Sequence, residues 1–91
     1  MATLIYSRRG LRDLERLAGF IEGPKVIDII AEAIEILAHH PYVGRKAEHG
    51  LRELVISRGK TGYIALSDYA AEEDVIAILA VRHQHEAGYE P

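Results

Sequence analysis

The sequence has no cysteine, only three prolines and no long apolar run among its 91 residues. Without cysteine, the chain has neither a disulfide framework nor a thiolate metal site, so packing must hold it together. No segment approaches the roughly 20 apolar residues of a membrane span. The start, MATLIYSRRG, puts a short apolar run ahead of its charges, the reverse of a secretory signal. These absences predict a cytoplasmic protein with no membrane association.

Several catalytic motifs are also missing. There is no glycine-rich phosphate loop, no serine nucleophile elbow and no recognisable pair of catalytic carboxylates. A chain of this length forms one domain, residues 1–91, and is small for a deep pocket around a large substrate. The net charge of -3 argues against a generally nucleic-acid-coating surface but leaves room for a local basic patch. We predict no cofactor.

The first half of the chain is predicted to hold one strand and two helices. Residues 3–6 are short, β-branched and aromatic, as in a strand. Ser7 is suited to cap a first helix, whose leucines recur at helical spacing. Gly23 and Pro24 end that helix and begin a second over 25–40, because proline fits a first turn but not a helix interior. The two amphipathic helices should form a hairpin.

The second half is predicted to hold three strands, in the segments LRELVIS, YIALSDY and VIAILAV. In the first of these, Leu54 and Ile56 share one face and Leu51 and Val55 the other, so we expect a strand covered on both sides or an irregular edge. Short loops between the three strands predict an antiparallel meander. The fold class is therefore α+β, in the order β-α-α-β-β-β, with the helical hairpin on a four-stranded, mainly antiparallel sheet. The sequence does not say which strand pairs with the first.

Titratable groups gather after the last apolar strand. Along an extended chain, Leu79, Val81, His83 and His85 would share one face, with Arg82 on the other. A histidine there could exchange a proton near neutral pH, Arg82 could hold a phosphate, and the nearby Tyr89 could donate a proton or stack on a base. The alternative is a solvated terminus that simply finishes the strand.

A metal site is the other chemistry that the two tail histidines suggest. His83 and His85 have the spacing of paired ligands, but further ligands would have to converge from elsewhere, from Glu86, His49, His39 or His40. These further residues have no fixed spacing relative to the two histidines, so we predict no metal site.

Two groups of positive charge stand out. The segment GRKAEHGLRELVISRGK has a local excess of cations, and Arg52 and Arg58 have the same parity, so a phosphate backbone could lie along that face. These charges could equally protect a strand edge or pair with nearby glutamates. The second group is ordinary helix solvation in the simplest interpretation, because acidic residues dilute it. Its members are Arg8, Arg9, Arg12 and Arg16.

Four segments in order resemble the toxin subunits of bacterial type II toxin–antitoxin modules, the RelE/ParE superfamily. They are YSRRGLRDLERLAGFI, AIEILAHHPYVGR, LRELVISRGKTGYIAL and VIAILAVRHQHEAGY, and together they cover nearly the whole chain. The resemblance implies the fold described above and a cognate antitoxin as partner. It also implies a target, either mRNA on the ribosome, which some members cut without a metal, or DNA gyrase, which others poison without established catalysis.

The resemblance also implies roles for particular residues. In the ribonuclease branch the acid–base groups would be His83, His85 and Tyr89. The positive groups that bind RNA or another target would be Arg45, Arg52, Arg58, Lys60 and Arg82. The chain departs from that branch at Ile64, after Tyr63, and at Gln84, where arginine is frequent. A third alternative is a degenerate toxin that retains only antitoxin binding.

Overall fold

The computed structural model describes residues 1–19, 24–58 and 61–84. The elements are β1 (Thr3–Tyr6), α1 (Arg8–Ala18), α2 (Pro24–Ile34), α3 (Ile36–His39), β2 (Arg45–Lys46), a 3₁₀ turn η1 (Glu48–Gly50), β3 (Arg52–Arg58), β4 (Thr61–Ala70) and β5 (Val75–His83). The predicted α+β class and the order of its main elements are confirmed. No helix in the described part of the chain is long and apolar enough to cross a membrane.

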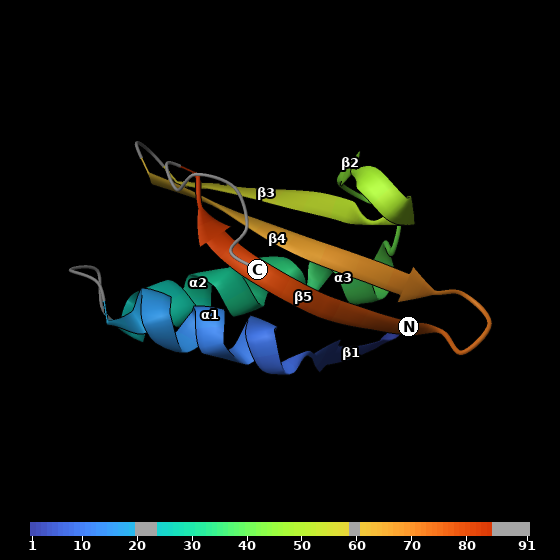
Figure 1. The fold of residues 1–91 in the computed structure, drawn as a ribbon, viewed down its shortest axis with the longest axis horizontal. Helices are drawn as coiled ribbons and strands as arrows, with labels where there is room; N and C mark the ends of the chain where they lie inside the picture. The colour runs from blue at the N-terminus through green and yellow to red at the C-terminus, as the bar shows by residue number, and fades with distance from the viewer. Residues whose placement is uncertain (20–23, 59–60, 85–91) are drawn as a thin grey trace.

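The sheet has five strands in the order β1-β5-β4-β3-β2 (Figure 1). The meander β3-β4-β5 is antiparallel as predicted, whereas β1 runs parallel to β5, with Thr3 opposite Val75. The predicted count of four strands was one too low. The additional strand, β2, pairs only two residues with β3, and two residues are too few to give an alternating sequence pattern.

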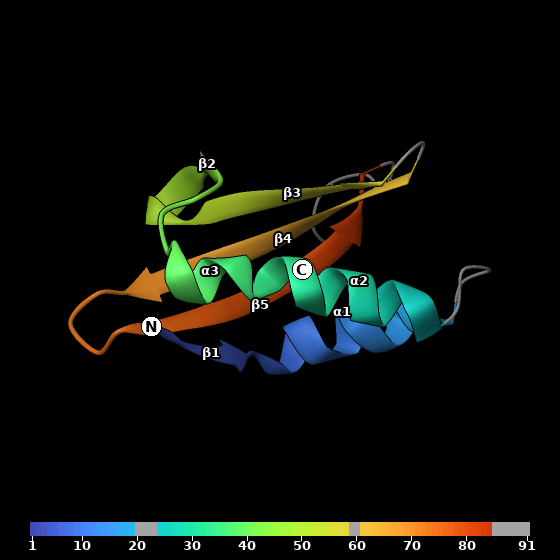
Figure 2. The ribbon, with the colours of Figure 1, turned by 180° about the vertical axis from the view of Figure 1, so that it is seen from behind.

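Helices α1 and α2 lie side by side on one face of the sheet (Figures 1 and 2). Ser7 caps α1 as predicted, because its Oγ accepts the backbone N–H of Gly10 at 3.0 Å. The predicted second helix over 25–40 is instead two, α2 and α3, separated at Glu35. There the N–H of Ala38 bonds the carbonyl of Glu35 at 3.1 Å, an i to i−3 bond that interrupts the α-helical register.

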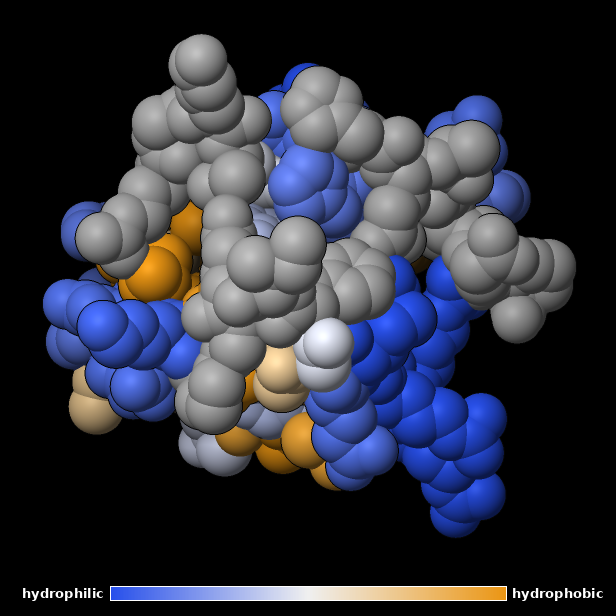
Figure 3. Space-filling view, turned by 90° about the vertical axis from the view of Figure 1, so that its left-hand side faces the viewer, coloured by the Kyte–Doolittle hydropathy of each residue, from blue (hydrophilic) through white to orange (hydrophobic). Residues whose placement is uncertain are grey.

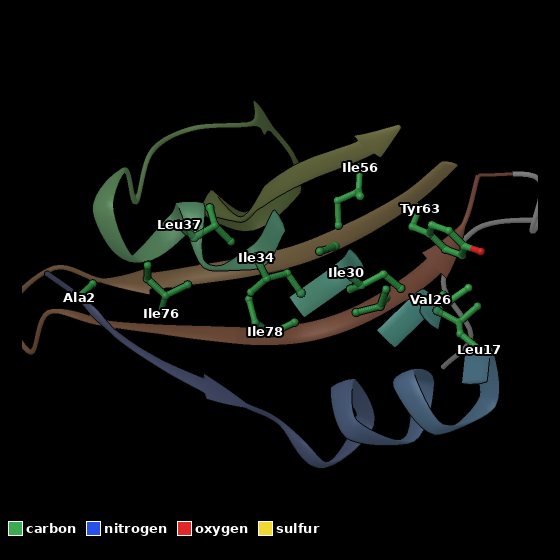
Figure 4. Close-up of a cluster of buried hydrophobic side chains, with 12 residues drawn as sticks. Ala2, Leu17, Val26, Ile30, Ile34, Leu37, Ile56, Tyr63, Ile76 and Ile78 are labelled. Carbon is green, nitrogen blue, oxygen red and sulfur yellow. The ribbon is translucent and has the colours of Figure 1, made fainter. Parts of the chain in front are cut away.

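The core fills the space between the helices and the sheet (Figure 4). Leu17, Ile30 and Ile34 from the helices are fully buried, as are Ile76 and Ile78 from β5. Burial of each such side chain stabilises the fold by roughly 1.5–3 kcal/mol. β5 lies between β1 and β4, as its continuous apolar sequence predicted.

A β-bulge changes which side chains of β5 face the helices. Ser67 lies opposite Ile78 and Leu66 opposite Ala80, so Leu79 has no direct partner in β4. The extra residue shifts the alternation, and the core face therefore runs Ile76, Ile78, Val81. The expectation that Leu79 shares a face with Val81 and His83 was wrong for this reason.

Strand β3 is covered on one side only. Ile56 is buried in the core, but Val55, on the opposite face, is 42% exposed. Of the two alternatives, cover on both sides was wrong, because both helices pack on the same face of the sheet (Figures 1 and 2). The other alternative, an irregular edge, agrees with the structure, because β2 pairs only with Arg52 and Glu53 of β3.

Candidate functional site

The end of β5 carries two of the predicted site residues, His83 and Arg82. His83 is half-buried, and its ring meets the Tyr63 ring edge-on, with centroids 5.3 Å apart and an interplanar angle of 83°. Tyr63 is directly opposite His83 in the sheet and belongs to the core. The histidine is thus held against a buried aromatic ring on the helix-covered face.

Arg82 points to the other face, opposite Ile64. Its Nη1 donates to the carbonyls of His83 at 3.3 Å and Gln84 at 3.4 Å. The guanidinium therefore folds along the backbone at the end of its own strand. His83 and Arg82 are neighbours in sequence but present their side chains on opposite sides of the sheet.

Three further predicted residues, His85, Tyr89 and Lys60, lie outside the described residues. Arg58 ends β3, where its backbone pairs with Thr61. Because Ile56 is opposite Tyr63, and Tyr63 is opposite His83, the backbone of Arg58 lies at the same end of the sheet as His83.

Arg45 and Arg52 lie at the opposite end of the sheet. Arg45 Nε contacts Glu53 Oε1 at 3.0 Å, and Arg52 Nη1 donates to the carbonyl of Gly44 at 3.2 Å. Arg52 also stacks over the Tyr42 ring, with Cζ 5.3 Å from the centroid. Of the predicted positive groups, these two are engaged with their own loop and lie far from His83.

The shared parity of Arg52 and Arg58 does not give a continuous positive track. Leu54 and Ile56, between them on the same face, pack against the core. The end of the molecule in Figure 3 shows hydrophilic side chains on both the left and the right of the view, with small hydrophobic areas also exposed. Among residues 1–19, 24–58 and 61–84, no group of three histidine or acidic side chains could hold a metal ion.

The sheet face opposite the helices is apolar where the strands meet in its middle. Ile64 is 4% exposed and Ala80 1% exposed, beside the half-exposed Val55. Ile64 is the position at which the ribonuclease branch often has arginine. A buried isoleucine there offers no charge for a phosphate.

A shallow pocket of about 390 Å³ opens on this face near β2. Its lining combines apolar side chains, Leu51 and Leu66 among them, with Glu48 and Glu53. His49, also on its rim, has a φ of 60°, a left-handed conformation that is uncommon outside glycine. None of the predicted site residues in the described part of the chain lines this pocket.

Two tyrosines outside the predicted site have perturbed acidity. Burial, and the nearby Glu35 carboxylate, raise the pKa of Tyr6 above its ordinary value. A hydrogen bond of 2.7 Å to Asp74 raises the pKa of the Tyr69 hydroxyl. Both shifts favour the neutral phenol, so neither group is prepared to act as a base.

Asp13 is a polar residue whose position the sequence did not reveal. Its Oδ2 accepts the backbone N–H of Val81 at 2.8 Å, 68 residues further along the chain. Arg9 and Arg16 flank the same carboxylate at 4.0 and 3.8 Å, and Arg16 Nη2 reaches the carbonyl of Val81 at 3.4 Å. Helix α1 thereby fixes β5 two residues before His83. Helical spacing alone identified Asp13 only as part of a solvated face.

The fold, a helical pair on a meander with a parallel first strand, is that of a known class of small toxins. It matches the isolated Escherichia coli RelE toxin with a TM-score of 0.73 and 13% sequence identity, covering 96% of this chain and 88% of the other. It matches a chain of the intact E. coli RelBE toxin–antitoxin complex with a TM-score of 0.72 and 17% identity, covering 98% of this chain and 100% of the other. It also matches a chain of the Mycobacterium tuberculosis RelBE2 toxin–antitoxin complex with a TM-score of 0.66 and 24% identity, covering 91% of this chain and 98% of the other.

Sequence relationships narrow this class to a family. The chain is 32% identical over 84 residues to Toxin RelE3 of Caulobacter vibrioides, covering 86% of this chain and 89% of the relative. The family described as ParE toxin of type II toxin–antitoxin system, parDE, matches residues 4–88. The chain belongs to this family of type II toxins, and the predicted RelE/ParE membership is confirmed.

Proposed function

We propose that this toxin arrests bacterial growth in the cytoplasm unless a cognate antitoxin binds it, and that it acts by binding DNA gyrase rather than by cutting mRNA. The observation that carries the second part is the buried Ile64 in an apolar sheet face. RNA cleavage needs positive groups that converge on a phosphate, because negative charge develops there in the transition state. In the described part of the chain Arg45 and Arg52 are at one end of the sheet, and the backbones of Arg58 and Arg82 are at the other. Arg82 itself is engaged with the carbonyls of His83 and Gln84.

The antitoxin follows from the family and from its solved relatives. Two of the matching structures are toxin–antitoxin complexes. This toxin exposes apolar side chains on both faces of the β2 side of the sheet: Ile36 of α3 is 47% exposed, Tyr42 in the turn after α3 is 60% exposed, and Val55, on the face opposite the helices, is 42% exposed. Such a surface suits a tightly bound partner, because the centre of a stable interface is apolar and rich in aromatic residues.

Pulse-labelling after induction without the antitoxin tests the mechanism. Amino-acid and thymidine incorporation are followed in one culture, with mRNA integrity measured in parallel. We expect thymidine incorporation to fall first, with mRNA intact, because gyrase poisoning stops replication. Early loss of amino-acid incorporation together with cut mRNA would contradict the gyrase target. Co-expression of the neighbouring gene should restore growth, and a failure to do so would contradict neutralisation.

Messenger cleavage is the second candidate, favoured by the histidine at the end of β5. His83 or His85 would act as base or acid, Arg52 or Arg82 would stabilise charge, and Tyr89 would stack or donate a proton. Arg45, Arg58 and Lys60 would then help to bind the RNA backbone. If this candidate holds, His83→Ala and Tyr89→Ala abolish arrest and leave folding intact. Arrest retained by a soluble double variant would exclude it.

A further inference from the structure

The four arginines of α1 belong to two groups with different roles. Arg9 and Arg16 flank Asp13 and so help to fix α1 on the edge of β5. Arg8 and Arg12 are exposed, and neither forms an ion pair with another described residue. The sequence alone showed a single, diluted cluster. The structure separates an inner pair, which is used by the fold, from an outer pair, which the fold does not require.

The outer pair flanks an exposed apolar side chain. Leu11 is 49% exposed, although leucine at this spacing would ordinarily face the core. Arg8, Leu11 and Arg12 are three and four residues apart, so they share one face of the helix. We call these three residues the outer face of α1. A solvent-exposed leucine beside two cations is the composition of a contact surface rather than of plain helix solvation.

We propose that the outer face of α1 binds an acidic, partly apolar surface on the protein that the toxin poisons. This inference rests on the proposed function and names the surface that performs it. Charge complementarity identifies the kind of partner, because two exposed guanidinium groups attract carboxylates and raise the rate of encounter. The toxin as a whole is acidic, with a net charge of -3, so its outer face is a local exception that orients the encounter.

The size of the two exposed surfaces assigns them to different partners. The outer face of α1 offers one apolar side chain, whereas the α3–β2–β3 margin offers Ile36, Tyr42 and Val43 and, on the other face of the sheet, Val55. A small, polar, charged contact fits a transient encounter with a target, and a larger apolar one fits a stable complex with an antitoxin. The outer face of α1 should therefore matter for arrest and not for neutralisation.

A charge-reversal pair tests the assignment. The full-length variant Arg8→Glu/Arg12→Glu is made together with its two single variants, and each single variant is compared with Lys25→Glu, which makes the same change in net charge at an exposed position outside both surfaces. We measure survival after induction, binding of purified DNA gyrase, binding of the purified product of the neighbouring antitoxin gene, and Tm. We expect the first variant to raise survival at least about 10-fold and to weaken gyrase binding to a similar extent, because like charges now face each other. The control variant should match the wild type.

Each other outcome overturns the proposal. Loss of antitoxin binding with arrest retained would assign the outer face of α1 to the antitoxin. Unchanged arrest, or equal loss in the control, would show ordinary solvation or a general effect of charge. A lowered Tm in the reversal pair is checked with Leu11→Ala, which removes the apolar contact without changing charge and should also reduce arrest. Failure of the proposed function is distinguishable, because it is seen in the wild type as cut mRNA or as no arrest.

Discussion

The two margins of the sheet are closed in different ways. On the β5 side, β1 pairs only as far as Ile78, and helix α1 then replaces a strand. Ser7 donates its N–H to the carbonyl of Ile78 at 2.9 Å and its hydroxyl to that of Leu79 at 3.2 Å, and Asp13 accepts the N–H of Val81. A helix can thus satisfy the free edge of a strand, provided that it lies close enough.

On the other side, β2 covers only Arg52 and Glu53 of β3. From Leu54 onward, no described strand pairs with β3 on the side away from β4. The contacts that hold this margin are surface contacts, such as Arg45 with Glu53 and Arg52 over Tyr42. The α1 margin is held by partly buried, directional bonds and the β2 margin by exposed ones, so we expect the α1 margin to contribute more to stability.

The largest expected effect is that of Gly10→Ala. A Cβ at Gly10 would lie 2.5 Å from the carbonyl oxygen of Ile78, a backbone atom that cannot move aside. Pushing α1 away from β5 should lower the free energy of unfolding by on the order of 3 kcal/mol, measured by urea denaturation. Gly19→Ala is the matched control, because its nearest contact is 3.4 Å and its φ of −81° suits any residue. Equal effects of the two would show that α1 is not closely docked.

Asp13→Ala should have the next largest effect. It leaves the N–H of Val81 without its acceptor and removes the carboxylate between Arg9 and Arg16. The expected loss in unfolding free energy is about 2 kcal/mol. Asp13→Asn keeps an oxygen acceptor and should lose less, and hydrogen exchange of the Val81 amide should speed up in the alanine variant alone. A stable alanine variant would show that α1 does not support the β5 edge.

Arg45→Ala tests the weak margin. Arg45 is 59% exposed, so its pair with Glu53 is screened by solvent. The variant should lose about 0.2–1 kcal/mol of unfolding free energy, and less at high salt. A loss as large as that of Asp13→Ala would remove the distinction between the two margins.

The smallest effect is that of Tyr69→Phe, which removes the hydrogen bond to Asp74 at the turn after β4. Because that bond raises the pKa of Tyr69 above 10.0, its contribution is fully present below pH 10 and is lost as the pH rises further, where the unfolded state releases the proton more readily. Wild type and variant should therefore differ by a constant amount near neutral pH and converge above pH 10. A difference that grows with pH would contradict this assignment.

The sequence predicted the features that depend on local periodicity. Helical spacing and the Ser7 cap located α1, and the apolar run of β5 predicted an interior strand. It could not locate features that depend on distant partners. Asp13 has the sequence context of a solvated residue, because its acceptor role involves an amide 68 positions away.

Other differences between the predicted and the observed structure arise from local features of single strands. The bulge at Leu66/Ser67 reverses the alternation in β5, and no residue there signals it. Val55 is exposed because both helices pack on the other face of the sheet. The alternation of apolar residues within β3 does not show on which face the helices pack. For the predicted site, the sequence indicated which types of residue to look for. Which end and which face of the sheet each residue occupies depends on how the strands are paired, and the sequence did not give that pairing.

The parallel pairing of β1 with β5 also affects how the protein is made. Thr3 can pair with Val75 only after the intervening residues have been synthesised. During translation β1 and α1 therefore cannot yet pack on β5, and such non-local closure is slow. We expect the nascent toxin to remain unfolded and harmless until Val75 has left the ribosome that makes it.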